Sequence, residues 1–352
     1  MEKSIKRIGI VGASSLPGKE LADELPESSL ALADLILLDD DAVTGQITAA
    51  GDEASFIQRL DAHSFDGMDV AFFTGSAEVT RTQWQVARGA GTSVVDMTYA
   101  LEGEKDVLVR APWVEKTLAG SSASGGPDLG TSAVIGAHPA AVMLALVAAR
   151  LKSLSTVTSI AATILEPASE HGRLAMDELH QQTVKLLSFQ PLPKEQYDAQ
   201  VAFNTLPALG DAATIRLAET QQRIAEHYGL LSAERLPELT IQLIHAPVFH
   251  GYVASVLIDL SEPTTAAQIK TALSGPHINV ITEESDPPSN LSAAGQADLL
   301  VRVTSAGANS TAGDRVRRFW LWLAADNIKL SALNAVACAV ELSRLRPSGK
   351  VQ

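Results

Sequence analysis

One stretch near the middle of the chain, Thr131–Leu151, constrains the fold most strongly. Its first part, Thr131–Ala137, is apolar and partly β-branched, which is typical of a short buried strand. Pro139 follows and suits the first turn of a helix, where its missing N–H costs little. Nearly every residue from Ala140 to Leu151 is apolar, so this segment is predicted to be a buried helix.

The start of this helix is a favourable place for a reactive nucleophile. Unpaired N–H groups and the positive end of the helix dipole gather there and would lower the pKa of a thiol. The first helical residues are instead Ala140, Ala141 and Val142, which carry no nucleophilic atom. The sequence therefore provides the position for a catalytic nucleophile without the chemical group.

Length, charge and cysteine content narrow the class of protein. A chain of 352 residues with 46% hydrophobic content is long enough for two domains. Its formal net charge of −14 argues against a nucleic-acid partner, because phosphate binding needs clustered Lys and Arg. The longest apolar runs, such as Ala140–Ala149, are too short to cross a membrane. The single cysteine, Cys338, excludes an internal disulfide, and the N-terminus lacks a signal-peptide pattern, so we expect a cytoplasmic protein.

The first half of the chain alternates strands with helices. This alternation predicts an α/β fold, a Rossmann-like doubly wound parallel sheet with helices on both faces. The expected strands are Lys6–Gly12, Leu35–Leu38, Asp69–Phe73 and Ser93–Asp96, and the expected helices cover Lys19–Leu25 and Ala77–Arg88.

The loop after the first strand is similar to the phosphate-binding turn of a dinucleotide-binding unit. Gly12 and Gly18 remain, but Ser15 and Pro17 stand between them, and Pro17 removes an N–H that a phosphate could use. A strand–helix turn that binds nothing is therefore the alternative interpretation.

Acidic residues follow the second expected strand. A carboxylate at this point can accept the ribose hydroxyls of NAD and repels the additional phosphate of NADP. The residues are Asp39, Asp40 and Asp41, and no basic residue lies near them in the sequence. If a nicotinamide cofactor binds, NAD is favoured over NADP, although three acids together are equally typical of a solvated turn.

The second half of the chain has long strand patterns and fewer helices, which favours an α+β domain with a mainly antiparallel or mixed sheet. Gly120–Gly130 precedes it and has the composition of a flexible loop. The expected strands are Val157–Leu165, Thr240–His245, Val253–Leu260, Leu299–Val303 and Phe319–Ala324. The expected helices are Leu174–Leu187, Ala212–His227, Thr264–Leu273 and Ile328–Arg346.

Short motifs follow one another along the whole chain. They are IGIVGASSLPG (Ile8–Gly18), DVAFFTGSAEVT (Asp69–Thr80), SVVD (Ser93–Asp96), AHP (Ala137–Pro139), AFNTLP (Ala202–Pro207), AET (Ala218–Thr220), APV (Ala246–Val248), AADN (Ala324–Asn327) and LNAV (Leu333–Val336). In this order and at this spacing, they resemble the motifs of aspartate-β-semialdehyde dehydrogenases.

The resemblance implies a cytoplasmic homodimer with a semialdehyde dehydrogenase fold. Residues 1–138 with 327–352 would form a Rossmann-like NAD(P)-binding domain, and residues 139–326 a dimerisation and catalytic-type domain. The family reduces aspartyl phosphate with NADPH, through a thioester on a cysteine, in amino-acid biosynthesis. The cofactor positions implied here are Gly12, Ser14, Ser15, Gly18, Asp39, Thr74, Gly75, Ser76 and Asn327.

Carrying the family's catalytic roles onto this chain gives a set of replacements. Ala141 stands at the position of the cysteine, Tyr252 at that of the general-base histidine, Glu166 at that of a glutamine and His245 at that of the arginine that grips the substrate carboxylate. Met97 and Glu102 stand where an asparagine and an arginine hold phosphate, whereas Glu219 matches the family's substrate-binding glutamate. No catalytic residue is therefore expected, because a methyl group cannot form a thioester.

Three functions are consistent with these residues. The first is a non-catalytic paralogue, similar to the Usg-type proteins that occur beside the true enzyme. The second is an NAD(P)-dependent oxidoreductase for another aldehyde, with Tyr252, His245, His250 or Glu166 as acid–base groups. The third is a nucleotide-binding sensor or scaffold. No metal site is expected, since His171, His245 and His250 lack a recognisable ligand spacing.

Overall fold

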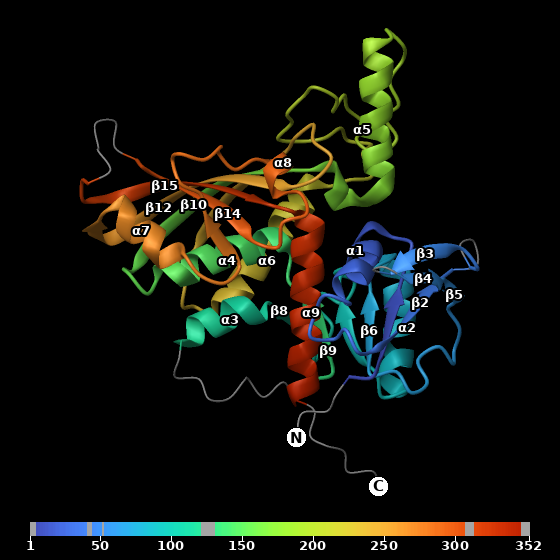
Figure 1. Cartoon of the computed structure of the whole chain (residues 1–352). Helices are drawn as coiled ribbons and strands as arrows, with labels where there is room; N and C mark the ends of the chain where they lie inside the picture. Colours follow the sequence, from blue (N-terminus) through green and yellow to red (C-terminus); the bar gives the residue numbers. More distant parts are fainter. Residues whose placement is uncertain (1–4, 41–43, 51–52, 121–130, 307–312, 346–352) are drawn as a thin grey trace. The chain divides into compact units, whose positions relative to one another are not determined.

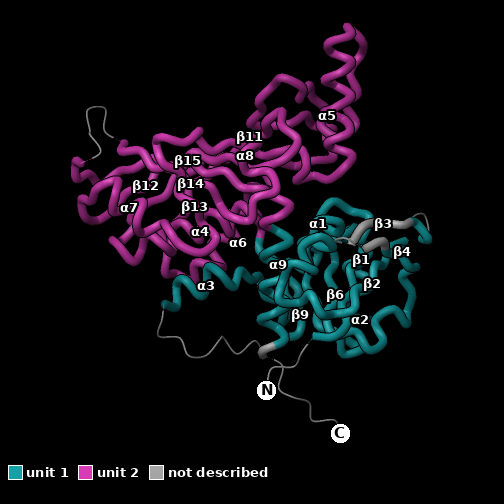
Figure 2. Tube along the Cα trace, viewed as in Figure 1, with its two compact units in different colours: residues 1–137, 331–352 teal, residues 138–330 magenta. Residues whose placement is uncertain are grey.

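The computed structural model describes residues 5–40, 44–50, 53–120, 131–306 and 313–345 (Figure 1). The chain divides into two compact units, which we call unit 1 (residues 1–137 and 331–352) and unit 2 (residues 138–330) (Figure 2). Asp41 and nearly all of the expected loop Gly120–Gly130 lie outside the described residues.

Unit 1 contains a seven-stranded parallel sheet in the order β5-β2-β1-β6-β7-β9-β8. The strands are β1 (Arg7–Val11), β2 (Asp34–Asp39), β5 (Gln58–Arg59), β6 (Val70–Phe73), β7 (Ser93–Asp96), β8 (Leu108–Arg110) and β9 (Ala133–Gly136). The helices are α1 (Leu16–Glu24), α2 (Ala77–Gly89) and α3 (Pro112–Ala119), and β3 (Ile47–Ala50) and β4 (Glu53–Phe56) form a separate hairpin.

Alternating residues of the parallel strands enter two hydrophobic cores. Ile8 and Ile10 pack in one core with residues of α1 and of the C-terminal helix α9 (Asn327–Leu345). Val11 packs in the other core with Trp84 of α2. Because both faces of a parallel sheet are buried in this way, the strands read as short continuous apolar runs. The predicted Rossmann-like sheet is confirmed.

Unit 2 is built on a six-stranded mixed sheet in the order β11-β10-β12-β15-β14-β13. Its strands are β10 (Val157–Glu166), β11 (Leu239–His245), β12 (Tyr252–Thr264), β13 (Ile278–Val280), β14 (Leu299–Ser305) and β15 (Val316–Ala325). Its helices are α4 (Pro139–Leu151), α5 (Gly172–Leu187), α6 (Leu217–Ser232), α7 (Ala266–Leu273) and α8 (Asn290–Ala293), with a 3-10 turn at Ala168–His171. The predicted mixed α+β organisation is confirmed.

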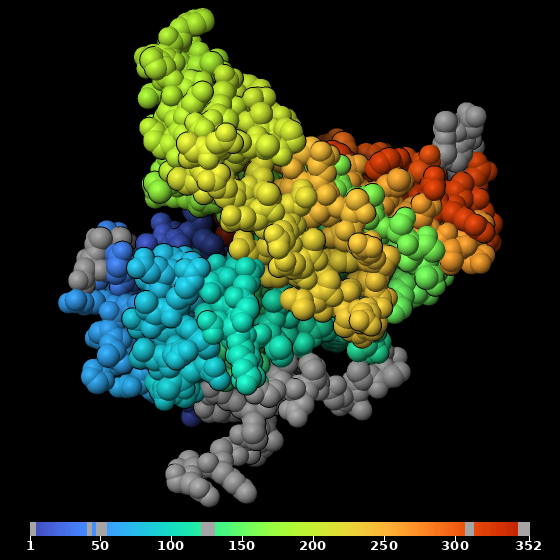
Figure 3. Space-filling view, turned by 180° about the vertical axis from the view of Figure 1, so that it is seen from behind, coloured from blue at the N-terminus to red at the C-terminus, as the bar shows by residue number. Residues whose placement is uncertain are grey.

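Helices α4, α6 and α7 lie on one side of this sheet (Figure 1). Helix α5 projects from the rest of unit 2 (Figures 1 and 3). The apolar helix predicted at the centre of the sequence is α4, in which every residue except Arg150 is buried. Pro139 is its first residue, and the His138 side chain caps it by accepting the N–H of Ala140 at 3.2 Å. Ala141 therefore lies in the first turn of a fully buried helix.

One predicted helix begins later than expected. The pattern from Ala212 indicated a helix, but α6 starts at Leu217. The backbone before it is held by another segment, since the N–H of Thr214 donates to the carbonyl of Gln196 at 3.0 Å. Tertiary hydrogen bonds here override a weak local preference for helix.

Candidate functional site

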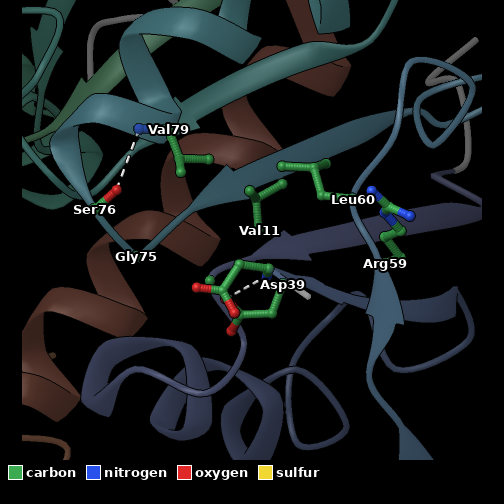
Figure 4. Close-up of a pocket in the computed structure, with 9 residues that line it drawn as sticks. Val11, Asp39, Arg59, Leu60, Gly75, Ser76 and Val79 are labelled. Atoms are coloured by element: carbon green, nitrogen blue, oxygen red, sulfur yellow. Dashed lines mark hydrogen bonds between the residues drawn. The ribbon is translucent and has the colours of Figure 1, made fainter. Parts of the chain in front are cut away.

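A cavity of about 300 Å³ lies in unit 1 at the carboxyl ends of its central strands (Figure 4). In open parallel sheets this edge is where ligands bind. Its apolar lining is Val11, Leu60 and Val79, and its other lining residues are Gly12, Asp39, Asp40, Arg59, Gly75 and Ser76. The structure thus brings four of the expected cofactor positions together around one cavity: Gly12, Asp39, Gly75 and Ser76.

The Asp39 carboxylate is held in place by two backbone donors. One oxygen accepts the N–H of Ser14 at 2.8 Å, and the other accepts the N–H of Asp40 at 2.9 Å. In Figure 4 Asp39 lies between the side formed by Gly75, Ser76 and Val79 and the side formed by Leu60 and Arg59. A fixed carboxylate in this position is suited to accept hydrogen bonds from a ribose diol.

Arg59 is a residue of this site that the sequence did not reveal. Strand β5 places Arg59 in parallel register with Asp39, and the N–H of Leu60 donates to the carbonyl of Asp39 at 3.0 Å. No basic residue lies near the second strand in the sequence, but strand β5 brings Arg59 beside it in space. The two residues are twenty positions apart, and a two-residue edge strand leaves no pattern that would have predicted their pairing.

The loop after β1 and the loop after β6 approach each other closely at Gly12 and Gly75, which both line the cavity. Gly12 has a φ of 86°, and a Cβ atom there would collide with the backbone of Gly75. The Thr74 hydroxyl donates to the carbonyls of Val11 at 3.1 Å and Gly12 at 3.0 Å. The Ser15 hydroxyl in turn donates to the carbonyl of Thr74 at 2.9 Å. Thr74 and Ser15 therefore fix the loops to each other, whereas Gly12 and Gly75 allow the close approach.

A second group of chemically active side chains lies in unit 2, around the start of α4. The Nε2 atom of His138 lies 3.0 Å from a carboxylate oxygen of Glu170, and the His138 ring lies 6.0 Å from that of Tyr252. Burial alone would raise the pKa of the Glu170 carboxyl, but His138, His171 and a hydrogen bond with Tyr252 lower it to about 2. Glu170 is thus an anion at neutral pH.

Glu166 forms the other half of this group. Its Oε2 atom lies 2.9 Å from Nε2 of His171 and 3.9 Å from Nδ1 of His245. Burial favours the neutral carboxyl, yet the neighbouring His171 outweighs burial and keeps the pKa of Glu166 below its ordinary value. Burial likewise opposes the charge on His171, but Glu166 raises the pKa of that imidazole above its ordinary value. We therefore describe Glu166 and His171 as a buried ion pair.

Ala141, Glu166, His245 and Tyr252 all lie in unit 2. The motifs did not reveal Glu170 and His171 as charged partners of this group, although they lie four and five positions after Glu166 in the segment EPASEH. The short spacing between Glu166 and His171 was the one sequence signal for these contacts. A 3-10 turn after β10 brings the side chains of Glu170 and His171 toward His138 and Glu166.

Asn327, an expected cofactor position, lies in unit 2 and contacts the second group. Its side-chain N–H donates to the Glu170 carboxylate at 3.4 Å, and its side-chain oxygen accepts the Ser169 hydroxyl and the Gly251 N–H, both at 3.1 Å. Three expected substrate positions lie outside both groups. Met97 is buried after β7 in unit 1. Glu102 and Glu219 are both exposed, in unit 1 and on α6 of unit 2 respectively.

The described part of the chain contains no group of three or more His, Cys, Asp or Glu side chains arranged to hold a metal ion. None of the helices in the same residues is long and apolar enough to span a membrane.

Two family models match the chain. The NAD binding domain of semialdehyde dehydrogenases matches residues 7–121, and the dimerisation domain of semialdehyde dehydrogenases matches residues 146–329. A USG-1 protein homolog from Pseudomonas aeruginosa is 30% identical over 333 residues, which cover 94% of this chain and 95% of that protein. The aspartate-semialdehyde dehydrogenase of Rickettsia conorii is 24% identical over 346 residues, 95% of this chain and 97% of that protein.

Solved structures agree with these matches. A probable aspartate-semialdehyde dehydrogenase from Pseudomonas aeruginosa has a TM-score of 0.81 and 28% identity, covering 96% of this chain and 98% of its own. Aspartate semialdehyde dehydrogenase II from Vibrio cholerae shares the fold, with a TM-score of 0.82 and 21% identity over 97% of this chain and 98% of its own. From its two sheets, their order and these matches together, the chain belongs to the semialdehyde dehydrogenase family.

Proposed function

We propose that this chain is a non-catalytic paralogue of aspartate-semialdehyde dehydrogenase. The observation that carries the proposal is Ala141, whose methyl group lies in the first turn of α4, at the position of the family's cysteine by the motif resemblance. Without a thiol or hydroxyl there, an acyl intermediate cannot form.

The surrounding charges support the same proposal. A substrate with a carboxylate or a phosphate needs a cation that is able to neutralise it. The imidazolium of His171 instead lies against Glu166 of the chain itself, and the buried His138 ring lies against Glu170. Tyr252, at the position of the family's base, also interacts with Glu170. An incoming anion would therefore meet two buried carboxylates.

The direct test is an assay of the purified chain with aspartate semialdehyde, phosphate and either NAD⁺ or NADP⁺, followed at the absorbance of the reduced nicotinamide. We expect no turnover above the rate without protein. Turnover of about 1 s⁻¹ or faster, the range of ordinary enzymes, would refute the proposal. A panel of other aldehydes with NADH, run in parallel, tests the alternative of an altered oxidoreductase.

A second candidate function, nucleotide binding without chemistry, is favoured by the cavity in unit 1. Asp39 suits the ribose diol of NAD, and the two carboxylates Asp39 and Asp40 oppose the extra phosphate of NADP, with Arg59 as the one lining cation among the described residues. We propose a preference for NAD over NADP. The expected result is a larger rise in melting temperature with NAD than with NADP at equal concentration.

We also infer a cytoplasmic homodimer. In this proposal, residues 1–138 with 327–352 act as the nucleotide-binding domain, and residues 139–326 act as the dimerisation domain. The match of residues 146–329 to a dimerisation domain supports the second assignment. Sedimentation of the purified chain tests it, since a monomer at micromolar concentration would exclude a stable dimer.

A further inference from the structure

The loop between β1 and α1 has few backbone donors left for a phosphate. In a dinucleotide-binding domain, the N–H groups at this helix N-terminus hold the pyrophosphate. Here Pro17 has no N–H, and Ala13, Ser14, Ser15 and Gly18 donate theirs within unit 1. Among the residues that the structure describes, Leu16 alone supplies a remaining N–H in this loop.

Two of these N–H groups already donate to side-chain oxygens of the chain, which occupy the acceptor positions that a phosphate would need. The Asp39 carboxylate accepts the Ser14 N–H at 2.8 Å, so an anion of the chain already lies at this loop. The Ser15 hydroxyl accepts the Gly18 N–H at 3.0 Å and caps α1. A pyrophosphate would have to displace both groups, and it would also lie beside the negative charge of Asp39.

The cavity is suited to the nucleoside part of a dinucleotide rather than to its pyrophosphate. Its lining comes from the ends of β1 and β2, from β5 and from the turn before α2, and it includes no residue of the described loop Ala13–Gly18. Apolar side chains suited to contact a base lie in it together with the fixed carboxylate of Asp39. These groups match a nucleoside with a vicinal diol.

We propose that the unit 1 cavity recognises the adenosine part of a ligand through its ribose diol, and that the pyrophosphate and nicotinamide of a dinucleotide add little affinity. The proposal rests on the nucleotide-binding candidate above and specifies its ligand class as a purine nucleoside or mononucleotide. The lining of the cavity fits the adenosine half of NAD, whereas the donors of the β1–α1 loop do not fit its pyrophosphate half.

Calorimetric titration of the full chain with adenosine, 2′-deoxyadenosine, AMP and NAD tests this proposal. Dissociation constants for adenosine, AMP and NAD should agree within about threefold, because the shared adenosine makes the contacts. The constant for 2′-deoxyadenosine should be about tenfold weaker, because it lacks one hydrogen bond to a charged acceptor. Asp39→Asn should weaken adenosine binding by a similar factor.

A pair of loop variants provides an independent readout. Pro17→Ala restores an N–H, and Ser15→Gly with Pro17→Ala also releases the N–H of Gly18. The ratio of NAD affinity to adenosine affinity should be about tenfold higher in the double variant than in the wild type, and this ratio is independent of any change in loop packing that affects both ligands. Lys270→Ala, in unit 2, is the matched control and should alter neither constant.

The possible results distinguish a failure of the adenosine inference from a failure of the proposed nucleotide binding. NAD binding more than about tenfold tighter than adenosine, equal affinity for 2′-deoxyadenosine, or no change of ratio in the double variant would overturn this inference and leave nucleotide binding intact. Failure of all four ligands to bind would overturn nucleotide binding itself and this inference with it.

Discussion

The replacements at the start of α4 compensate one another. A buried carboxylate without a partner is strongly destabilising, because its desolvation is not repaid. Glu166 lies against His171, and Glu170 lies against His138, so each carboxylate has an imidazole within about 3 Å. These contacts stabilise the folded state of unit 2, and they direct both imidazoles to carboxylates of the chain rather than to an anionic substrate. In the proposed function, this set of residues therefore stabilises the fold without supporting the family's reaction.

Restoring the thiol alone should not restore the reaction. In the variant Ala141→Cys, the new side chain would lie at the N-terminus of α4, but Tyr252 would stand where the family has its base and His245 where it has its arginine. We expect no measurable oxidation of aspartate semialdehyde. The variant Ala141→Cys, Glu166→Gln, His245→Arg, Tyr252→His restores four of the six replaced family side chains, and we expect more activity from it than from Ala141→Cys.

The same assay used for the wild-type chain checks this prediction, with melting temperatures confirming that both variants fold. Enzyme-like turnover by the single variant would show that the nucleophile was the only missing part. It would then contradict the role assigned here to the surrounding carboxylates.

The buried ion pairs also predict how stability depends on pH. The pKa of Glu170 is lowered from 4.5 to about 2, so its contribution is complete above about pH 4.5 and is lost as the pH falls toward 2. The pKa of His171 is raised from 6.5, so its contribution is complete below about pH 6.5 and is lost as the pH rises through the raised value. The urea midpoint of unfolding should therefore be highest between about pH 4.5 and 6.5.

The double variant Glu166→Gln, His171→Gln removes one of the pairs and serves as the control. Its urea midpoint should fall less than that of the wild type between pH 6.5 and 9. Equal declines in the two proteins would mean that His171 does not carry the alkaline loss of stability.

At the scale of elements, the continuously apolar strands and the central helix could be predicted from the sequence, whereas the two-residue strand β5 could not. The strands that become β1, β6 and β7 are continuous apolar runs because both faces of their sheet are buried. Strand β5 has two residues, too few to form a pattern, so Arg59 could not be assigned to the cavity. The position of Ala141 could be predicted because adjacent residues in a motif keep their order. The contacts of Glu166 could not, because they depend on a turn that reverses the chain.

The C-terminal helix α9 is tied to strand β8 by charged groups within unit 1. The guanidinium of Arg110 donates to both carboxylate oxygens of Glu341, at 3.0 and 2.8 Å, and also contacts Glu115. The carbonyl of Arg110 accepts the side-chain N–H of Asn334 at 3.1 Å. Helix and strand thus share one polar connection beside their apolar packing.

Glu341→Ala should lower the free energy of unfolding of unit 1 by about 1–3 kcal/mol, the usual loss when hydrogen bonds to a charged group are removed. Urea unfolding followed by the fluorescence of Trp84 and Trp113, both in unit 1, would measure the change. Asp23→Ala, an exposed acidic residue of the same unit, should alter the value by no more than about 0.5 kcal/mol. If Glu341→Ala lowers the free energy of unfolding no more than Asp23→Ala does, the contact between Arg110 and Glu341 contributes nothing to stability.

At the scale of the whole molecule, one face of the unit 2 sheet is suited to association. Trp320 and Trp322 lie two positions apart on β15 and are 44% and 39% exposed. Trp320 lies opposite Leu257 of β12, which lies opposite Ala161 of β10, so these side chains share one face. We call this set of four residues the open face. Large aromatic side chains exposed together are typical of protein interfaces.

Trp320→Glu should convert the proposed dimer to a monomer. A charge at the centre of an apolar interface must be desolvated, and loss of a central Trp costs about 2 kcal/mol or more, which weakens dimerisation roughly 30-fold or more. Sedimentation velocity at micromolar concentration measures the change. Leu32→Glu is the matched control, because Leu32 is 99% exposed in unit 1 and its replacement should leave the dimer intact. A dimer that persists in Trp320→Glu would place the interface away from the open face, since a buried glutamate at that position could not be accommodated without loss of affinity.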